Sequence, residues 1–321
     1  MLTSSINDQL RGLGESAFIR EVIADFGSAC PPCPHGPGDD VAVLPPTGRQ
    51  RLVTTDPVIL GRHFTQADRP ADVAAKLIRR NLSDIAAMGG RPEAAILSMA
   101  LTGDSSRRWL RAFIRALGRE ARRFGVAIVG GDCAQTDGAP GFFLTLLGES
   151  TSGRVLTRAG GQIGDALYVT GSLGGSRLGR QFRFQPRLDE GRWLAGRRSV
   201  HSMIDLSDGM AKDLLDLIPD GAAALIEASD VPIAPAARRM AQSSGFPALH
   251  HAFHDGEDFE LLFTISARAA PERLAAAWRK RFKTRLTRIG RIVPLSANRP
   301  TIEVIHPPEG FLLGEGYEHF R

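Results

Sequence analysis

The sequence of 321 residues predicts an α/β protein built from two α+β domains. Its length exceeds the roughly 250–300 residues at which a single hydrophobic core stops growing. Apolar runs typical of strands alternate with helical patterns in both halves of the chain. Residues 148–164, near the middle, are rich in Gly, Ser and Thr and are typical of a linker. We therefore expect one domain at residues 1–150 and a second at residues 151–321.

Strands and helices alternate in the first half. One expected helix begins at a Pro and ends at Gly89-Gly90, and an Arg-rich amphipathic pattern indicates a second helix. The expected strands are Arg51–Thr55, Ala94–Leu101, Val126–Val129 and Phe142–Leu147, and the expected helices are Pro70–Met88 and Ser105–Phe124.

The second half begins again with a strand. Its expected strands are Ala166–Thr170, a strand that ends at Asp205, and Phe259–Ile265, and its expected helices are Met210–Leu217 and Pro271–Phe282. Gly171–Gly175 directly follow the first of these strands. They form either a turn or a second phosphate-binding loop.

Composition and charge exclude several classes of protein. No apolar run approaches the roughly 20 residues that cross a bilayer, and the first residues lack a secretory signal, so we expect a cytoplasmic protein without a membrane partner. The net charge of +5 is concentrated in residues 268–291, which carry nine Lys or Arg against one Glu. Few aromatic residues accompany these cations, which favours a solvated face over a nucleic-acid site.

The three cysteines are too few for a disulfide framework in a chain of this length. Cys30 and Cys33 are spaced like zinc ligands, but no second Cys pair completes a site. We expect a loop stiffened by proline at this position.

Asp recurs beside Gly or a hydroxyl residue near the ends of apolar runs, whereas P-loop and protein-kinase motifs are absent from the sequence. Each instance alone is typical of a turn or a helix cap. Carboxylates at strand ends of an α/β sheet nevertheless converge, and they repel one another unless cations lie between them. The instances are Gly38–Asp40, Thr54–Asp56, Asn81–Asp84, Gly130–Asp132 and Asp205–Gly209. Because oxygen ligands select Mg²⁺, we predict a magnesium–phosphate complex as the ligand.

Asp84 lies inside an expected helix, on one face with Lys76 and Arg80 at four-residue spacing. It either pairs with Arg80 or, because an apolar run follows it, points toward the interior. Gly130-Gly131 either brings amide groups close to a phosphate or forms a tight turn. Arg158 either clamps a phosphate or lies in a solvated linker.

Three histidines, His250, His251 and His254, form a cluster in the second half. The spacing of His250 and His254 permits a zinc site on a helix. The acidic residues that follow favour a loop in which Glu257 contacts the substrate.

Taken together, these strings resemble the thiamine-monophosphate kinase family of the aminoimidazole-ribonucleotide-synthetase-like superfamily, nearly from end to end. Both their order and their spacing agree with that family. They are Gly38–Leu44, Thr54–Asp56, Gly61–Phe64, Lys76–Gly89, Val129–Asp132, Leu156–Arg158, Ile204–Gly209, Gly256–Leu262 and Gly316–Phe320. The resemblance implies an N-terminal domain with a mixed sheet that dimerises, a C-terminal α/β domain, and a site near their junction.

The resemblance also implies the activity, an ATP-dependent phosphorylation of thiamine monophosphate to thiamine diphosphate by a homodimer. Magnesium ions are implied to be held by Asp40, Thr54, Thr55, Asp56, Asp84, Asp132, Asp205 and Asp208. Gly131, Arg158 and Ser207 are implied to contact ATP, and His63 and Glu257 are implied to contact the phosphorylated acceptor.

Two positions depart from the family pattern, and both concern the acceptor. Gly314 stands where family members often carry Trp, so we expect Tyr317 to supply an aromatic contact. Asp255 replaces the first Gly of a Gly-Gly-Glu-Asp string and adds a carboxylate near the acceptor.

The expected chemistry requires no strong general base, because an acceptor phosphate oxygen is already nucleophilic near neutral pH. We expect catalysis by in-line positioning and charge neutralisation, with Asp84, Asp132 and Arg158 as the catalytic residues. Two other functions fit the same residues. One is a related ATP-dependent synthetase or kinase that acts on another phosphorylated or amide acceptor, and the other is a non-catalytic ATP-binding sensor.

Overall fold

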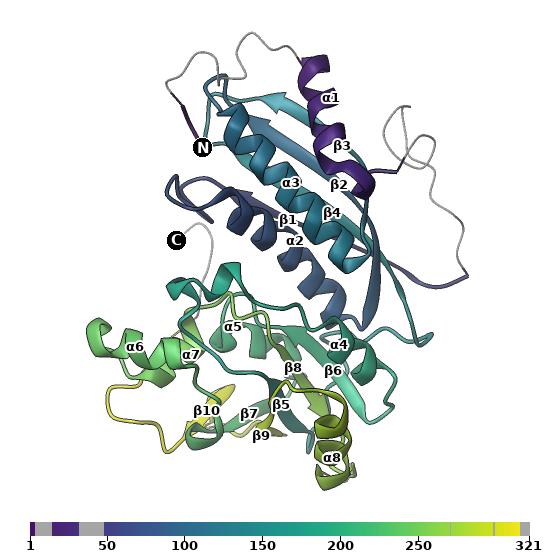
Figure 1. The fold of residues 1–321 in the computed structure, drawn as a ribbon. Helices are drawn as coiled ribbons and strands as arrows, with labels where there is room; N and C mark the ends of the chain where they lie inside the picture. The colour runs from purple at the N-terminus through teal and green to yellow at the C-terminus, as the bar shows by residue number, and fades with distance from the viewer. Residues whose placement is uncertain (4–14, 32–47, 270, 298, 315–321) are drawn as a thin grey trace. The chain divides into compact units, whose positions relative to one another are not determined.

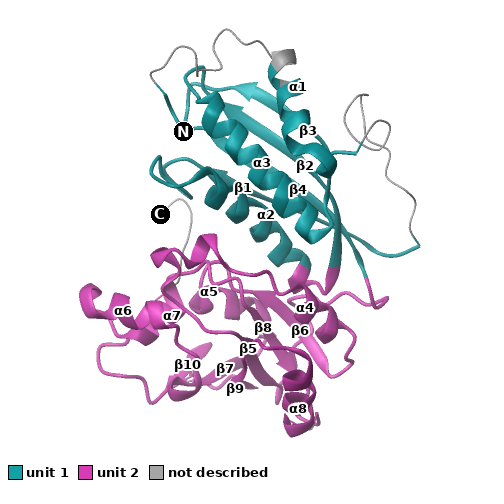
Figure 2. Cartoon of the chain, in the orientation of Figure 1, with its two compact units in different colours: residues 1–85, 91–150 teal, residues 86–90, 151–321 magenta. Residues whose placement is uncertain are grey.

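A computed structural model describes residues 1–3, 15–31, 48–269, 271–297 and 299–314. The predicted site residues Asp40 and Tyr317, and also Cys33, lie outside the described residues. The chain forms two compact units, shown in Figure 2. Unit 1 comprises residues 1–85 and 91–150, and unit 2 comprises residues 86–90 and 151–321.

Unit 1 is built on a mixed four-stranded sheet with the strand order β1-β4-β2-β3. Strands β1 and β4 pair antiparallel, whereas β2 and β3 pair parallel. The strands are β1 (Arg51–Ile59), β2 (Gly90–Leu101), β3 (Ala127–Gln135) and β4 (Gly141–Ser150), and the helices are α1 (Glu15–Phe26), α2 (Pro70–Ala87), α3 (Arg107–Phe124) and the 3₁₀ turn Gly27–Ala29. The expected strands and helices of this half are therefore confirmed, with strands that extend further than the apolar runs.

Helices α2 and α3 cover one face of this sheet (Figure 1). Helix α3 begins where the Ser106 side chain accepts a hydrogen bond from the Trp109 amide, and it ends at Gly125 in the left-handed conformation. Phe113 of α3 stacks on Phe142 of β4 with ring centroids 4.1 Å apart, and both rings are fully buried. The core of unit 1 therefore lies between these helices and the sheet.

The opposite face of the sheet exposes large apolar side chains. Val53 of β1 is 65% exposed, Phe143 of β4 is 39% exposed and Ile96 of β2 is 37% exposed. Each of the three directly precedes or follows a residue that faces the helices, and successive side chains of a strand point to opposite faces. The described residues of unit 1 thus leave an apolar sheet face without a helix on it.

Strand β3 differs from the expectation of a short strand followed by a glycine turn. Gly130-Gly131 and Asp132 lie inside β3, which pairs with β2 as far as Gln135. A Cβ atom at Gly131 would lie 2.0 Å from the carbonyl oxygen of Leu97, so glycine permits the close approach of the two strands. No tight turn forms at this point, and Asp56 likewise lies within β1, not after it.

Unit 2 contains a six-stranded sheet with the order β10-β7-β9-β5-β8-β6. Only the β10–β7 pair is parallel among the pairs described. Its strands are β5 (Ala166–Thr170), β6 (Val200–Asp205), β7 (Ala222–Glu227), β8 (Leu261–Ile265), β9 (Leu286–Pro294) and β10 (Ile302–Ile305). Its helices are α4 (Leu188–Ala195), α5 (Met210–Asp213), α6 (Pro235–Ser244), α7 (Ala248–His254) and α8 (Pro271–Arg281), with 3₁₀ turns at Ser176–Leu178, Arg180–Phe182, Leu214–Leu217 and Ala228–Asp230.

The sheet of unit 2 is buried on both faces. Leu167 and Val169 of β5 belong to one buried cluster, whereas Tyr168 belongs to another. Because alternate residues of a strand point to opposite faces, the two clusters lie on opposite sides of the sheet. Ala86 and Ala87, at the end of α2, join the second cluster and group with unit 2.

Two local expectations for unit 2 were wrong in detail. The expected helix at Met210–Leu217 is α-helical only to Asp213 and continues as a 3₁₀ turn. The strand expected from Phe259 begins at Leu261, because Phe259 has a φ of 51° and cannot extend the strand. The histidine cluster lies on helix α7, and Glu257 lies in the loop that follows this helix.

Candidate active site

In unit 1, strand β1 and helix α2 bring predicted metal ligands together. The Thr54 hydroxyl donates a hydrogen bond to the Asp84 carboxylate at 2.5 Å. Arg80, one turn earlier on α2, donates to the Asp56 carboxylate at 3.2 Å. Thr54, Asp56 and Asp84 therefore share the face of the sheet on which α2 lies, and both carboxylates are partly buried there.

Thr55 lies on the other face of the sheet. Its hydroxyl accepts a hydrogen bond from Thr145 of β4 at 3.2 Å, and its side chain is exposed. The strand alternation that places Thr54 against α2 necessarily directs Thr55 away from it.

Gly131 and Asp132 lie at the opposite edge of the same sheet. Strands β4 and β2 stand between β1 and β3, so the two edge strands are separated by about 14 Å at the usual strand spacing. Asp132 lines a cavity of about 100 Å³, together with Gly131, Cys30 and Cys133 and apolar residues of α1 and β2. Thr54 and Asp56 therefore lie on the edge strand opposite to the one that carries Asp132.

His63 lies in the turn after β1. Its Nδ1 accepts a hydrogen bond from the Ile59 amide at 3.2 Å, and the buried Lys76 ammonium donates to the His63 carbonyl at 2.9 Å. Lys76 thus holds the segment that carries His63, a role that its helical spacing did not reveal.

In unit 2, Asp205 is the last residue of β6, and Ser207 and Asp208 follow it in a tight loop. The Asp213 carboxylate accepts hydrogen bonds from the amides of Ser207, Asp208 and Gly209 at 2.9, 3.0 and 3.1 Å. Burial, followed by the charges of Asp205 and Asp208, raises the pKa of Asp213 to about 8. Sequence reasoning missed Asp213, although an acidic residue in the first turn of a helix is the available signal.

The loop that carries Glu257 is joined to the loop that carries Ser207. The Glu257 amide donates to the Ser207 carbonyl at 2.7 Å, and the Phe259 amide donates to the Leu206 carbonyl at 2.8 Å. Glu257 has a left-handed backbone with a φ of 53°, which is uncommon for a residue with a side chain. The predicted nucleotide-binding and acceptor-binding residues of unit 2 therefore lie on one hydrogen-bonded pair of loops.

Of the two alternatives for Gly171–Gly175, the structure disfavours a phosphate-binding loop, because carboxylates of the protein itself occupy the amide groups of Gly174 and Gly175. The Gly174 amide donates to Asp258 at 2.8 and 3.0 Å, and the Gly175 amide donates to Asp255 at 2.7 Å. Gly171 has a φ of 63°, and a Cβ atom there would lie 2.0 Å from the Glu260 carboxylate.

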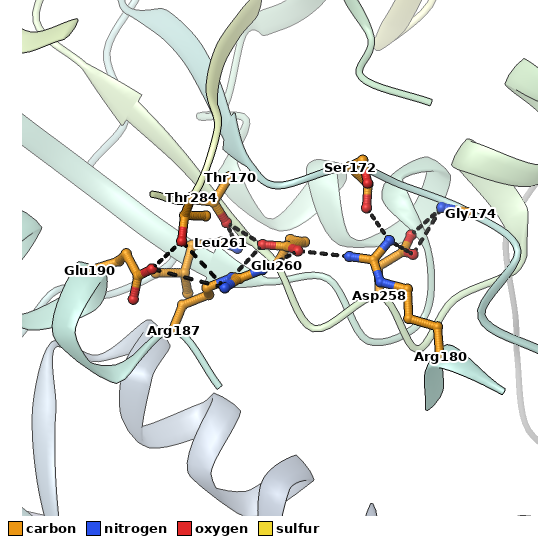
Figure 3. Close-up of polar contacts among 10 residues, drawn as sticks. All are labelled: Thr170, Ser172, Gly174, Arg180, Arg187, Glu190, Asp258, Glu260, Leu261 and Thr284. Carbon is orange, nitrogen blue, oxygen red and sulfur yellow. Dashed lines mark hydrogen bonds and ion pairs between the residues drawn. The ribbon is translucent and has the colours of Figure 1, made fainter. Parts of the chain in front are cut away.

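Glu260 is the centre of a buried ion-pair network, shown in Figure 3. Arg187 binds its two oxygens through two nitrogens at 2.7 Å, and Arg180 and the Thr170 hydroxyl each donate at 2.7 Å. The Glu260 side chain is 1% exposed. No pattern in the sequence indicated this network, because charged residues are expected at the surface.

Arg158 and the histidine cluster have partners in unit 2. The Arg158 guanidinium contacts Asp216 at 2.6 Å and is 60% exposed. His254 donates from Nδ1 to the His250 carbonyl at 2.8 Å, and its Nε2 accepts the Gly314 amide at 2.8 Å. His251 contacts Asp255 at 2.9 Å. Hydrogen bonds to the protein thus occupy the ring nitrogens of His254 that a zinc ion would require.

The donors in both units are suited to a hard cation. The predicted ligands are carboxylate and hydroxyl oxygens, which Mg²⁺ prefers. Within either unit, the described residues contain no group of three or more His, Cys, Asp or Glu side chains arranged to hold a metal ion. Among the described helices, none is long and apolar enough to cross a membrane.

Comparison with known proteins first defines the class of the chain. Residues 38–150 match the family model of the AIR synthase related protein, N-terminal domain. The hydrogenase maturation protein HypE of Escherichia coli has a TM-score of 0.73 at 19% identity, with 93% of this chain and 97% of that chain covered, and shares the fold. The chain therefore has the AIR synthase-like fold.

Sequence relatives then define the family. A thiamine-monophosphate kinase of Rhodopirellula baltica is 35% identical over 268 residues, which cover 80% of this chain and 83% of the relative. The chain belongs to the thiamine-monophosphate kinase family. Among solved structures, thiamine-monophosphate kinase from Stenotrophomonas maltophilia has a TM-score of 0.71 at 31% identity, covering 84% of this chain and 90% of that one. AaThiL complexed with AMPPCP and TMP has a TM-score of 0.72 at 25% identity, covering 98% and 100%.

Proposed function

We propose that this protein transfers the γ-phosphoryl group of ATP to thiamine monophosphate and so forms thiamine diphosphate. Its family supports the activity, and the complex of AaThiL with AMPPCP, an ATP analogue, and TMP supports the two substrates. The observation that carries the proposal is the 2.7 Å hydrogen bond from the Glu257 amide to the Ser207 carbonyl. It joins the residue proposed to contact the acceptor to the residue proposed to contact ATP.

The acceptor phosphate is its own nucleophile, so the residues of the chain need only bind and orient the two phosphate groups. Ser207, Gly131 and Arg158 are proposed to contact ATP, and His63, Glu257 and Tyr317 are proposed to contact the acceptor. The guanidinium of Arg158 is accessible, since it is 60% exposed and pairs with an exposed Asp216. Its exchange from Asp216 to a phosphate therefore costs little free energy.

Magnesium fits the oxygen donors of this chain. Asp40, Asp56, Asp84, Asp132, Asp205 and Asp208, with Thr54 and Thr55, are the residues proposed to hold it. When bound, the metal supplies positive charge that stabilises the transferring phosphoryl group. Arg80 and Lys212 now neutralise Asp56 and Asp208, at 3.2 and 2.6 Å respectively. These two carboxylates are therefore already held near cationic groups.

We also propose a cytoplasmic homodimer that forms through the sheet of unit 1. The apolar face that contains Val53, Ile96 and Phe143 supports this proposal, since an exposed apolar patch favours association. A second copy of the chain is the partner that the family resemblance implies.

ADP release by the purified protein with Mg-ATP and thiamine monophosphate tests the activity directly. We expect stoichiometric ADP and thiamine diphosphate, and loss of both when EDTA is added. Release of ADP with free phosphate and a modified acceptor would instead indicate a synthetase of the same fold. Binding of ATP without turnover on any phosphorylated acceptor would indicate a sensor.

A further inference from the structure

The loop from Asp255 to Glu260 is held by three of its own carboxylates. The Asp255 carboxylate accepts a hydrogen bond from the Gly175 amide at 2.7 Å. The Asp258 carboxylate accepts hydrogen bonds from the Gly174 amide at 2.8 and 3.0 Å. The Glu260 carboxylate accepts hydrogen bonds from the Thr170 hydroxyl and from the guanidinium groups of Arg180 and Arg187. All of these donors lie within residues 170–187, so three carboxylates of one loop bind one neighbouring segment. Glu257, the residue proposed to contact the acceptor, lies between them.

Arg180 connects the members of this arrangement to one another (Figure 3). One guanidinium nitrogen donates to Glu260 at 2.7 Å. The other lies 3.6 Å from Asp258 and donates to the carbonyl of Ser172. The planar guanidinium can reach these groups at once through separate nitrogens, whereas a lysine carries all its donors on one nitrogen atom. Arg180 therefore fixes Asp258 and Glu260 relative to the segment before it.

The loop has two features that cost free energy, a buried carboxyl group and two residues with left-handed backbones. Asp258 is 1% exposed, and burial raises its pKa to about 8, opposed by the charge of Arg180. Glu257 and Phe259, on either side of it, have left-handed backbones with φ of 53° and 51°. Such backbones persist only where the surrounding contacts hold them, and they concentrate at functional sites.

We infer that Asp258 and Arg180 are positioning residues that hold the Glu257 loop in its acceptor-binding form and thereby set the affinity for the phosphorylated acceptor. The inference rests on the proposed function, because it takes Glu257 as the acceptor contact. Neither residue is proposed to touch a reacting atom. Both act through the loop, by way of the Gly174 amide and the Ser172 carbonyl.

The test compares Asp258→Ala with Asp258→Asn. Alanine removes the acceptor of the Gly174 amide, whereas asparagine retains a carbonyl oxygen of similar position. We expect Asp258→Ala to raise the KM for thiamine monophosphate about tenfold or more, with kcat and the KM for ATP changed less than about threefold. Asp258→Asn should restore the acceptor KM to within about threefold of the wild-type value. Glu303→Gln, at an exposed ion pair of the same unit, is the control for charge removal elsewhere.

Hydrogen–deuterium exchange provides a readout that does not depend on turnover. Asp258→Ala should speed exchange in peptides that cover residues 171–175 and 255–260, and Asp258→Asn should not. If Asp258→Ala does not fold, Arg180→Lys replaces it, with the same expected rise in acceptor KM and in exchange.

Two results would overturn the inference while the proposed function stands. These are an acceptor KM within twofold of the wild-type value in Asp258→Ala or Arg180→Lys, and equal impairment by alanine and asparagine. If the wild-type protein shows no turnover, the proposed function fails, and the exchange comparison alone decides whether Asp258 holds the loop.

Discussion

Replacement of Glu260 tests how the charged interior of unit 2 contributes to its stability. Glu260→Gln keeps the size of the side chain but turns one acceptor oxygen into an NH₂ donor. Each Glu260 oxygen accepts two hydrogen bonds at 2.7 Å. An amide nitrogen in place of Oε1 would lose both guanidinium bonds, whereas in place of Oε2 it would lose only the Arg187 bond, because the Thr170 hydroxyl can accept a hydrogen bond from it. At about 1.5–3 kcal/mol for each hydrogen bond to a charged group, the loss of one or two such bonds is about 1.5–6 kcal/mol. Removal of one partner from a buried ion pair typically costs about 3–5 kcal/mol, which lies within this range.

Urea denaturation followed by circular dichroism measures the change in unfolding free energy. A loss of this size also lowers the melting temperature by about 3–24 °C for a unit of this length. The matched control is Glu303→Gln, because Glu303 pairs with Arg299 at 2.6 Å but is 38% exposed. This exposed pair should contribute less than about 1 kcal/mol. Equal stability of the two variants, within about 1 kcal/mol of wild type, would refute the reasoning.

Four further predictions follow from the site and the sheet. Asp84→Asn should lower kcat for ADP release about a hundredfold or more with an unchanged circular dichroism spectrum, and a rate within threefold of wild type would contradict a metal-binding role. Asp213→Ala removes the acceptor of three loop amides and should raise the KM for Mg-ATP about tenfold, whereas an unchanged KM would show that the loop needs no such support. Val53→Asp combined with Phe143→Asp should yield a monomer in sedimentation velocity, and a persistent dimer would place the interface elsewhere. Burial raises the pKa of Asp258 from 3.8 to about 8. Between pH 4 and pH 8 the folded protein therefore keeps a proton on Asp258 that the unfolded protein loses. The unfolding free energy of the wild-type protein should consequently fall as the pH rises from 4 to 8. Asp258→Asn should reduce the slope of this dependence in urea titrations at several pH values without abolishing it, because the pKa of Asp213 is also raised to about 8. Parallel curves for the two proteins would contradict the assignment.

Local patterns in the sequence were sufficient for most elements of the fold. Helix α3 could be predicted because Ser106, Gly125 and an apolar stripe each mark it independently. Strand β3 could not be predicted to its end, because Gly130-Gly131 is a turn signal in isolation and a close strand contact only when β2 lies beside it. Whether such a Gly-Gly pair forms a turn or stays in a strand depends on which strand lies beside it. A single sequence does not show which strands pair.

Some residues of the candidate site could likewise be predicted from the sequence, whereas others could not. Asp84 and Thr54 were predicted from spacing and resemblance, and a hydrogen bond joins them in the structure. Glu260 was not predicted, because its partners Arg180 and Arg187 lie 80 and 73 residues earlier in the chain. A charged side chain is assigned to the surface by default, and only the fold shows that three such groups satisfy one another in the interior.

The end of helix α2 limits how this chain can be cut or recombined. Ala86 and Ala87 are buried with Leu194 and Ala195, so residues 86–90 complete the apolar interior of a unit whose remainder begins at residue 151. A fragment that starts at Thr151 would expose part of that apolar interior to solvent. A fragment that stops at Ser150 would contain Ala86 and Ala87 without the residues against which they pack. Chimaeras with a related kinase therefore need three junctions, after residues 85, 90 and 150, with residues 86–90 and 151–321 taken from the same parent.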